Sequence, residues 1–349
     1  MIDEPERGGG WPPLAAAPLA GLALSRHDHY PRDDIARRQR MQQHAAALDA
    51  QWRAEDAAPG GIGHAMLRMT GADPDIIFAK LSSYLTDHSW VQRRLRAALA
   101  LSAADPFAMP PLRMFSGGAL GGLILAEVPP ITLSLMIRPF NQPTPRDPSV
   151  IFSPGHGLTQ IVRSGGACIR RYRVRLSDEE RAGKFRSATA APLEVLGTAP
   201  LGDGDQIRVD QQCESFNLTP GDGDLVMLQL FVHAASRVPM REYDPTTGRL
   251  IRAAAAGRAT SFRQMGLAVL RAFGRSDAAP LFAAALNDDD FAMRWQVMRE
   301  LVALDPQAAL PPLGTMAADD PHPEVRAAAQ ATLAILRERT ARTLVAEPA

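Results

Sequence analysis

The chain of 349 residues is long enough for two domains, or for one large domain with appended segments. It is 46% hydrophobic and 22% charged, a composition that supports a packed core and argues against global disorder. Its 38 basic and 38 acidic residues give a formal net charge of +0, so bulk charge indicates neither nucleic-acid binding nor attraction to a membrane surface.

Residues 1–31 are rich in Gly and Pro, which predicts a loosely ordered arm. The apolar run 14–24 is similar to the core of a signal peptide, but the residues before it are acidic where a signal peptide needs positive charge. No apolar run is long enough to cross a membrane, and we therefore expect a cytoplasmic protein. His27-Asp28-His29 carries metal-donor atoms, yet its position in the arm favours a solvated loop.

Residues 32–110 read as a helical segment. The first helix is expected from Asp33 to about Glu55, with apolar residues three and four apart at Ile35, Met41, Ala45, Leu48 and Trp52. The run 58–63 breaks this helix. Asp73-Pro74 then starts a second helix, and Asp87 starts a third that ends near Pro106.

Residues 111–254 read as a β-domain of many short strands separated by Gly, Pro and Asp. This spacing predicts an antiparallel sandwich or jelly-roll barrel rather than alternating βαβ units. The expected strands are 112–116, 123–127, 131–138, 150–153, 159–163, 167–176, 193–196, 206–210, 213–218 and 225–232, followed by a ladder within 241–252. Cys168 and Cys213 fall in these runs and are expected to be buried free thiols, with a disulfide or a reactive thiol as alternatives.

Two copies of one phrase lie inside the β-domain, Leu201-Gly-Asp-Gly-Asp205 and Pro220-Gly-Asp-Gly-Asp224, and each leads into an apolar strand. Gly-Asp turns suit this role because Gly reaches positive φ and Asp bonds nearby backbone. The carboxylates offer calcium ligands as an alternative. The rhythm of residues 150–232 resembles a cupin barrel.

The cupin resemblance implies a metal held by His and Glu side chains. Only His156 stands near the first expected position, with His233 and Glu214 as further donors. A metal centre needs three or four converging ligands, and these three residues are the alternative set for a divalent transition metal. The main expectation is a barrel without a cofactor.

The strand that contains Arg171, Arg173 and Arg175 has alternating side chains, which places these three on one face and Arg170 with Tyr172 and Val174 on the other. A row of guanidinium groups suits carboxylates or phosphates, so this row is a candidate site for a small anionic ligand or an acidic partner. The alternative is an exposed face with ion pairs to nearby acidic residues.

Residues 255–340 read as helical, beginning with a helix from Thr260 to Gly274 whose apolar residues are Phe262, Met265, Leu267, Val269 and Leu270. An internal repeat follows, because the pattern that starts at Asp288 recurs at Asp320. The phrase Asp320-Pro-His-Pro-Glu-Val-Arg326 resembles the second helix of a HEAT repeat, which implies a polar ladder between repeats. Two copies are fewer than a free-standing array needs, so we expect the helices to dock on the β-domain. Residues 341–349 are expected to be a flexible tail.

These patterns favour an α+β protein with a central cupin-like β-domain and HEAT-like helices. Its expected role is non-enzymatic: a binding or scaffolding protein for a protein partner or a small anionic ligand, without nucleic acid or membrane. The helical candidates for partner contact are Trp295, Arg299 and Arg326. The alternative is a metal-dependent cupin-type enzyme, a dioxygenase or isomerase, that uses His156 and His233.

Overall fold

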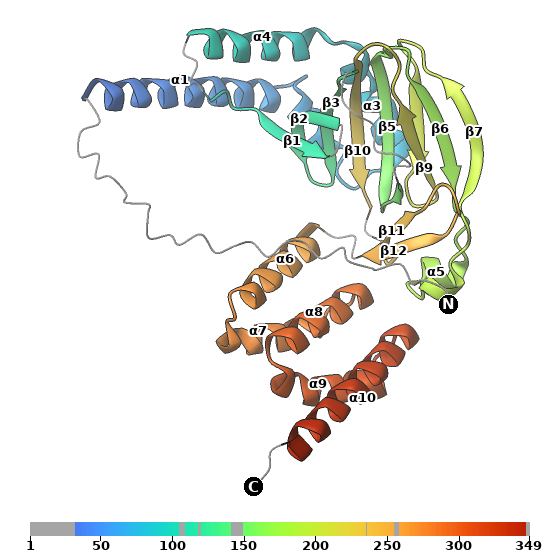
Figure 1. Ribbon diagram of the computed structural model, residues 1–349. Helices are drawn as coiled ribbons and strands as arrows, with labels where there is room; N and C mark the ends of the chain where they lie inside the picture. The colour runs from blue at the N-terminus through green and yellow to red at the C-terminus, as the bar shows by residue number, and fades with distance from the viewer. Residues whose placement is uncertain are drawn as a thin grey trace, which may run out of the picture.

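The structure is a computed structural model that describes residues 32–104, 109–117, 120–140, 149–234, 236–254 and 258–346. N-terminal helices, a central antiparallel β-domain and a C-terminal helical array follow one another along the chain (Figure 1). The expected α+β architecture is therefore confirmed. The predictions for the arm, including His27-Asp28-His29, lie outside the described residues.

Four helices precede the sheets: α1 (Arg32–Ala57), α2 (Ile62–Arg68), α3 (Pro74–Thr86) and α4 (Ser89–Ala104). α3 begins as its sequence predicts, because the Asp73 carboxylate accepts a hydrogen bond from the backbone N–H of Asp75 and Pro74 occupies the first turn. α2 was not expected, since Gly61 and Gly63 suggest a break. It is held instead by Ile62 and Met66, which are buried beneath it.

The largest sheet has six antiparallel strands in the order β1-β2-β3-β10-β5-β8. Their bounds are β1 (Arg113–Gly117), β2 (Leu120–Val128), β3 (Ile131–Arg138), β10 (Leu225–His233), β5 (Gly155–Arg163) and β8 (Gln206–Asp210). Alternation along β10 divides its side chains between two cores. Leu228, Leu230 and Val232 pack against the N-terminal helices, whereas Met227 packs in the core on the other face.

Two three-stranded sheets complete the β-domain, in the orders β7-β6-β9 and β12-β11-β4. Their strands are β7 (Glu194–Pro200), β6 (Cys168–Arg173), β9 (Glu214–Thr219), β12 (Leu250–Ala254), β11 (Met240–Tyr243) and β4 (Val150–Phe152). A short helix α5 (Asp178–Arg181) and a 3₁₀ turn η2 (Ser187–Thr189) join β6 to β7. Apolar residues of β6 share a core with β5, β8 and β10, so the sheets form two packed layers.

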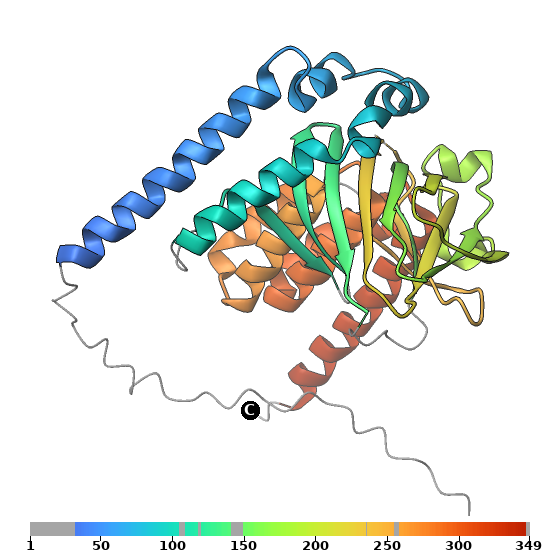
Figure 2. The same ribbon diagram turned by 90° about the horizontal axis from the view of Figure 1, so that it is seen from above.

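Helices α2, α3 and α4 share one hydrophobic core with the six-stranded sheet. Met66, Leu81 and Val91 from the helices cluster with Leu133 and Leu230 from β3 and β10. In Figure 2, α1 and α4 extend past the edge of the sheet. The boundary at residue 110 therefore separates helices from strands without separating two cores.

Both Gly-Asp phrases fold against the turn at residues 164–166. The Asp203 carboxylate accepts hydrogen bonds from the backbone N–H and the hydroxyl of Ser164, at 2.7 Å each. The Gly223 N–H donates to the carbonyl of Gly165 at 3.0 Å. A Cβ at Gly221 would collide with that same carbonyl, so glycine is required there by close approach.

The C-terminal array consists of α6 (Arg258–Ala272), a 3₁₀ turn η3 (Ser276–Ala278), α7 (Ala279–Ala285), α8 (Phe291–Leu304), α9 (Pro306–Asp319) and α10 (Pro323–Ala346). The ladder implied by the repeat forms between Arg294 and Asp320, whose side chains are nearly buried. Arg294 donates to the carboxylate through Nε at 2.9 Å and Nη2 at 2.8 Å, and Nη1 donates to the carbonyl of Asp288 at 2.9 Å.

The array contacts the β-domain at the start of α10, as its sequence led us to expect. The Nε2 atom of His322 lies 2.5 Å from the carbonyl oxygen of Phe185, and the His322 ring stacks on Phe291 with centroids 3.9 Å apart. The Ala188 N–H donates to the Glu324 carboxylate at 3.0 Å. The helical array therefore contacts the β-domain through the loop between β6 and β7.

Candidate binding surfaces

The row formed by Arg171 and Arg173 of β6 and by Arg175 just past its end is exposed, but two of its three members already have acidic partners. Arg173 pairs with Glu214 at 2.8 Å and Arg175 pairs with Glu194 at 2.9 Å. The hydrogen bond from Arg173 to Glu214 raises the pKa of the guanidinium. These partners come from β9 and from β7, and not from the acidic residues of α5 that follow in sequence. An acidic ligand on this row would compete with both pairs.

The expected alternation along β6 is interrupted at its centre. A β-bulge separates Arg171 from Tyr172 on the side of β7. Arg170 is exposed rather than buried with Tyr172, and its guanidinium carbon lies 5.6 Å from the Tyr172 ring centroid. Arg170 and Arg171 therefore both reach solvent, a change that only the pairing with β7 imposes.

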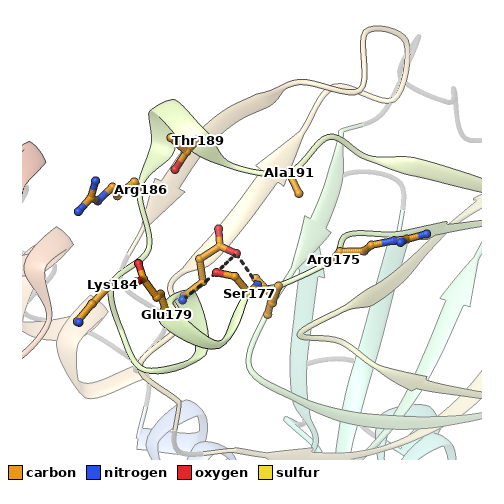
Figure 3. A pocket seen from close by; sticks show the side chains of 9 residues that line it. Arg175, Ser177, Glu179, Lys184, Arg186, Thr189 and Ala191 are labelled. Carbon is orange, nitrogen blue, oxygen red and sulfur yellow. Dashed lines mark hydrogen bonds between the residues drawn. The ribbon is translucent and has the colours of Figure 1, made fainter.

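Arg175 also contributes to a pocket of about 420 Å³ beside α5. The other lining residues are Leu176, Ser177, Glu179, Glu180, Lys184, Arg186, Thr189 and Ala191. Glu180 is held in a capping box, because its carboxylate accepts hydrogen bonds from the N–H and hydroxyl of Ser177. In Figure 3, Lys184 and Arg186 extend to one side of the pocket and Arg175 extends to the opposite side.

Lys184 and Arg186 did not emerge from the sequence as candidate site residues. Neither alternation nor helical spacing relates them to Arg175. They lie around one pocket because the chain doubles back through α5 and η2 before β7.

An apolar stripe, defined as Phe262, Met265, Val269 and Phe273, runs along the exposed side of α6 and just past its end. These residues are 74%, 58%, 47% and 77% exposed, respectively. Spacings of three and four residues place them on one face. The opposite side of α6 packs into the array through Leu267 and Leu270. The apolar residues of α6 therefore form two faces, one packed in the array and one exposed.

The three helical residues chosen from the sequence lie in different environments. Trp295 is half-buried against the core of the array. Arg326 donates to the carbonyl of Asp320, which completes the polar ladder beneath the repeat. Arg299 is exposed, with a 3.4 Å hydrogen bond to Gln296. The stripe on α6 was missed, although two apolar faces on one helix are a signal that sequence can provide.

The alternative metal ligands His156, His233 and Glu214 do not converge. His156 pairs with Val232, so adjacent His233 projects from the opposite face of the six-stranded sheet. Glu214 lies on β9 in another sheet and binds Arg173. Within the described ranges, no cluster of three His, Cys, Asp or Glu side chains is placed to hold a metal.

The remaining sequence candidates have structural roles or differ from expectation. The Asp203 carboxylate is engaged by Ser164, and these hydrogen bonds lower its pKa. Asp205 and Asp224 accept backbone N–H bonds from Gly202 and Phe140. Cys168 and Cys213 are free, as expected, but half-buried. Cys213 lies in the turn before β9 rather than in a strand, which leaves it closer to the surface.

Comparison with known proteins finds a family model that matches one part of the chain. Residues 249–334 match the model of HEAT repeats. These residues are the helical array together with β12, so the resemblance of the C-terminal segment to HEAT repeats is confirmed. No curated protein matches the chain significantly.

Solved structures of cupin domains are similar to part of the chain. A cupin-2 domain from Rhodospirillum rubrum shares 8% identity over 38% of this chain and 78% of its own, with a TM-score of 0.24. A cupin domain from Bordetella pertussis shares 8% over 34% and 99%, with a TM-score of 0.21. A cupin 2 barrel protein from Rhodopseudomonas palustris shares 11% over 38% and 81%, with a TM-score of 0.23. Among the described helices, none has the length and apolar character of a membrane span.

Proposed function

We propose that this protein is a non-enzymatic binding or scaffolding protein whose HEAT-like array receives an amphipathic helix of a protein partner on the stripe of α6. The observation that supports this most is the stripe itself, because Phe262 and Phe273 are each about three-quarters exposed. Contiguous apolar surface of this kind is unusual on a soluble protein and marks interaction sites.

The position of the stripe favours a helix as the occupant. Helical repeats bury their apolar faces by stacking on neighbours, and the outer face of a terminal helix is ordinarily polar. α6 is the first helix of this array and packs on α8 with its inner face only. Its outer face is apolar, as an internal helix of a longer array would be. A partner helix would continue the stack.

Charge around the stripe is compatible with such a partner. α6 contains no acidic residue, and its Arg263 and Arg271 are paired with Asp288 and Glu300 of the array. These two arginines of α6 are therefore neutralised by ion pairs, and a partner that covered the stripe would leave neither of them buried without a counter-charge. The arginine row of β6 supports a partner less well, since Glu214 and Glu194 already occupy it.

Site-specific cross-linking tests this proposal. A photo-reactive amino acid at Met265 should capture a partner in cells that express the protein, and the captured peptide should be an amphipathic helix of another protein. The same amino acid at Ile335 of α10, which is 53% exposed, is the matched control. Phe262→Ser with Phe273→Ser should abolish capture at Met265, while changing the stability by no more than about 0.5 kcal/mol per exposed site.

Three results would contradict the proposal. Capture at Ile335 that equals capture at Met265 would show non-specific contact. Capture that survives the double substitution would show that the stripe is not the contact surface. A cross-link to a second copy of the chain, with a concentration-dependent mass in light scattering, would identify the stripe as a self-association surface instead.

A further inference from the structure

Arg241 of β11 is a buried cation without a counter-anion. It is 1% exposed, and its Nη2 atom donates to the carbonyl of Gln212. Its Nε and Nη1 atoms have no hydrogen-bond partner among the described residues, and no carboxylate in those ranges forms an ion pair with it. A guanidinium stays protonated inside proteins, so its charge is not relieved by releasing a proton.

Tyr243, two residues later on β11, is also a buried polar side chain without a well-formed hydrogen bond. It is 0% exposed, and among the described residues its hydroxyl has only the Arg241 guanidinium within interaction range, without a well-aligned hydrogen bond to it. Arg241 and Tyr243 share one face of β11, opposite Phe152 and Val150 of β4. Two neighbouring polar groups on one face are thus buried with part of their hydrogen-bonding capacity unused.

The surroundings of these donors are mostly aromatic. The guanidinium carbon of Arg241 lies 5.5 Å from the ring centroid of Phe152 and 5.9 Å from that of Phe185. Tyr172, Val174 and Leu193 pack on the same cluster as Tyr243. The charge of Glu180 influences both groups, and its carboxylate accepts hydrogen bonds from Ser177. Such walls strengthen any charge-assisted hydrogen bond formed between them.

The pocket beside α5 lies next to this cluster. Phe185, whose ring covers Arg241, stands between Lys184 and Arg186, which both line the pocket. Leu176 and Ser177 of the pocket follow Val174 of the cluster along the chain. The cationic side chains Arg175, Lys184 and Arg186 outnumber the carboxylates of Glu179 and Glu180 in this lining, so its net charge favours the same sign of ligand as the buried donors.

We infer that Arg241 and Tyr243 form an internal site for a small oxyanion, a phosphate or a carboxylate, that enters from the pocket past the ring of Phe185. A buried cation that has no counter-charge and leaves donors unused is stabilised by an anionic acceptor. An oxyanion supplies several acceptor oxygens and one neutralising charge, which matches these donors. The site is independent of the α6 stripe, so loss of either leaves the other intact.

Calorimetric titration of the full chain, after dialysis into chloride buffer, tests this inference. Inorganic phosphate and acetate are titrated separately, which distinguishes the two kinds of oxyanion. At least one should bind and should raise the melting temperature more than chloride at equal ionic strength. Arg241→Met should abolish binding, whereas Tyr243→Phe should weaken it by about 10-fold through loss of one hydrogen bond to a charged group. Arg299→Met, on the exposed face of α8, should bind as the wild type does.

Binding of neither anion to the wild type would overturn the inference. Undiminished binding by Arg241→Met would overturn it as well. If Arg241→Met does not fold, Tyr243→Phe decides, since it removes one oxygen without changing the packing, and unchanged affinity in that variant refutes the site. Replacing Lys184 and Arg186 by Ser should slow association and reduce its salt dependence while the dissociation rate stays the same. An unaltered association rate would refute entry past the rim.

Discussion

At the scale of single residues, the repeat depends on one buried ion pair. Burial alone would raise the pKa of Asp320, but the hydrogen bonds from Arg294 and the N–H of His322 outweigh it and lower that pKa. Arg294 also reaches the carbonyls of Asp288 and Asp289, so it joins the two copies of the repeat. The Asp residues that first revealed the repeat in the sequence are the two that this guanidinium connects.

Asp320→Asn should lower the free energy of unfolding by about 3–5 kcal/mol, because it leaves the buried Arg294 without its counter-charge. Denaturant titration followed by circular dichroism measures this change. Asp277→Asn, which breaks an exposed pair with Arg275, is the control and should cost at most about 1 kcal/mol. Equal losses in the two variants would contradict a special role for the buried pair.

The ion pair between Arg294 and Asp320 also predicts that the stability of the protein depends on pH in the acidic range. The pKa of folded Asp320 is below its ordinary value of 3.8, so its stabilising contribution is fully present above that pH. The contribution is lost as the pH falls through the lower, folded pKa. Wild-type stability should therefore drop more steeply below pH 3.8 than the stability of Asp320→Asn. Parallel pH curves from denaturant titration would argue against this origin.

At the scale of elements, the start of α10 attaches the helical array to the β-domain. His322 is 5% exposed, although its residue type is more often at a surface. The Nε2 atom donates to the Phe185 carbonyl, which places the proton on that nitrogen, while Phe291 covers the ring. The loop at residues 177–191 thus carries the pocket on one side and the array on the other.

His322→Ala should loosen this attachment while the helices of the array stay folded. Losing the hydrogen bond leaves a buried carbonyl unsatisfied, at a cost of about 1–3 kcal/mol. Amide hydrogen exchange should rise in residues 182–190 and in the first turn of α10. Arg299→Ala, on the exposed face of the neighbouring helix, should change neither region. Unchanged exchange after His322→Ala would mean that other contacts attach the array.

At the scale of the whole molecule, the six-stranded sheet has a core on each face. Its outer face is covered by α2, α3 and α4, and its inner face by β6 and β9. Arg94 of α4 adds polar contacts between the helices and the sheet, since it donates a hydrogen bond to the Leu125 carbonyl of β2 and forms an ion pair with Asp56 at the end of α1. α1, in contrast, has no buried side chain before Trp52 among those described.

Truncations should separate these two parts of the N-terminal segment. Deleting residues 1–44 should leave a soluble protein whose melting temperature changes by no more than about 4 °C, because few buried contacts are lost. Deleting residues 1–104 should give an insoluble chain, since it uncovers the apolar face formed by Leu133, Leu230 and their neighbours. Soluble yield and thermal unfolding measure both outcomes. A folded, soluble product of the longer deletion would refute the shared core.

Local patterns in the sequence were sufficient for most elements and for the repeat. Alternation placed strands at 131–138 and 206–210, which are the bounds of β3 and β8. The cap at Asp73 was also readable, because it depends on residues a few positions apart, and the repeat was readable because the short pattern at Asp288 recurs at Asp320. α2 was not predicted, because a segment of seven residues with an internal Gly has little intrinsic preference for the helical conformation. Burial of Ile62 and Met66 stabilises it as a helix.

The binding surfaces depended on contacts between residues far apart in sequence. Strand pairing put His156 and His233 on opposite faces of the sheet. Packing of neighbouring strands gave Arg173 and Arg175 their acidic partners. The path of the chain through α5 and η2 grouped Lys184 and Arg186 with Arg175. The position of α8 decided which face of α6 is core and which is exposed. Burial of Arg241 depended on Phe152 and Phe185 closing over it. Composition and periodicity thus determined the elements of this protein, whereas long-range packing alone decided which of their side chains are free to bind.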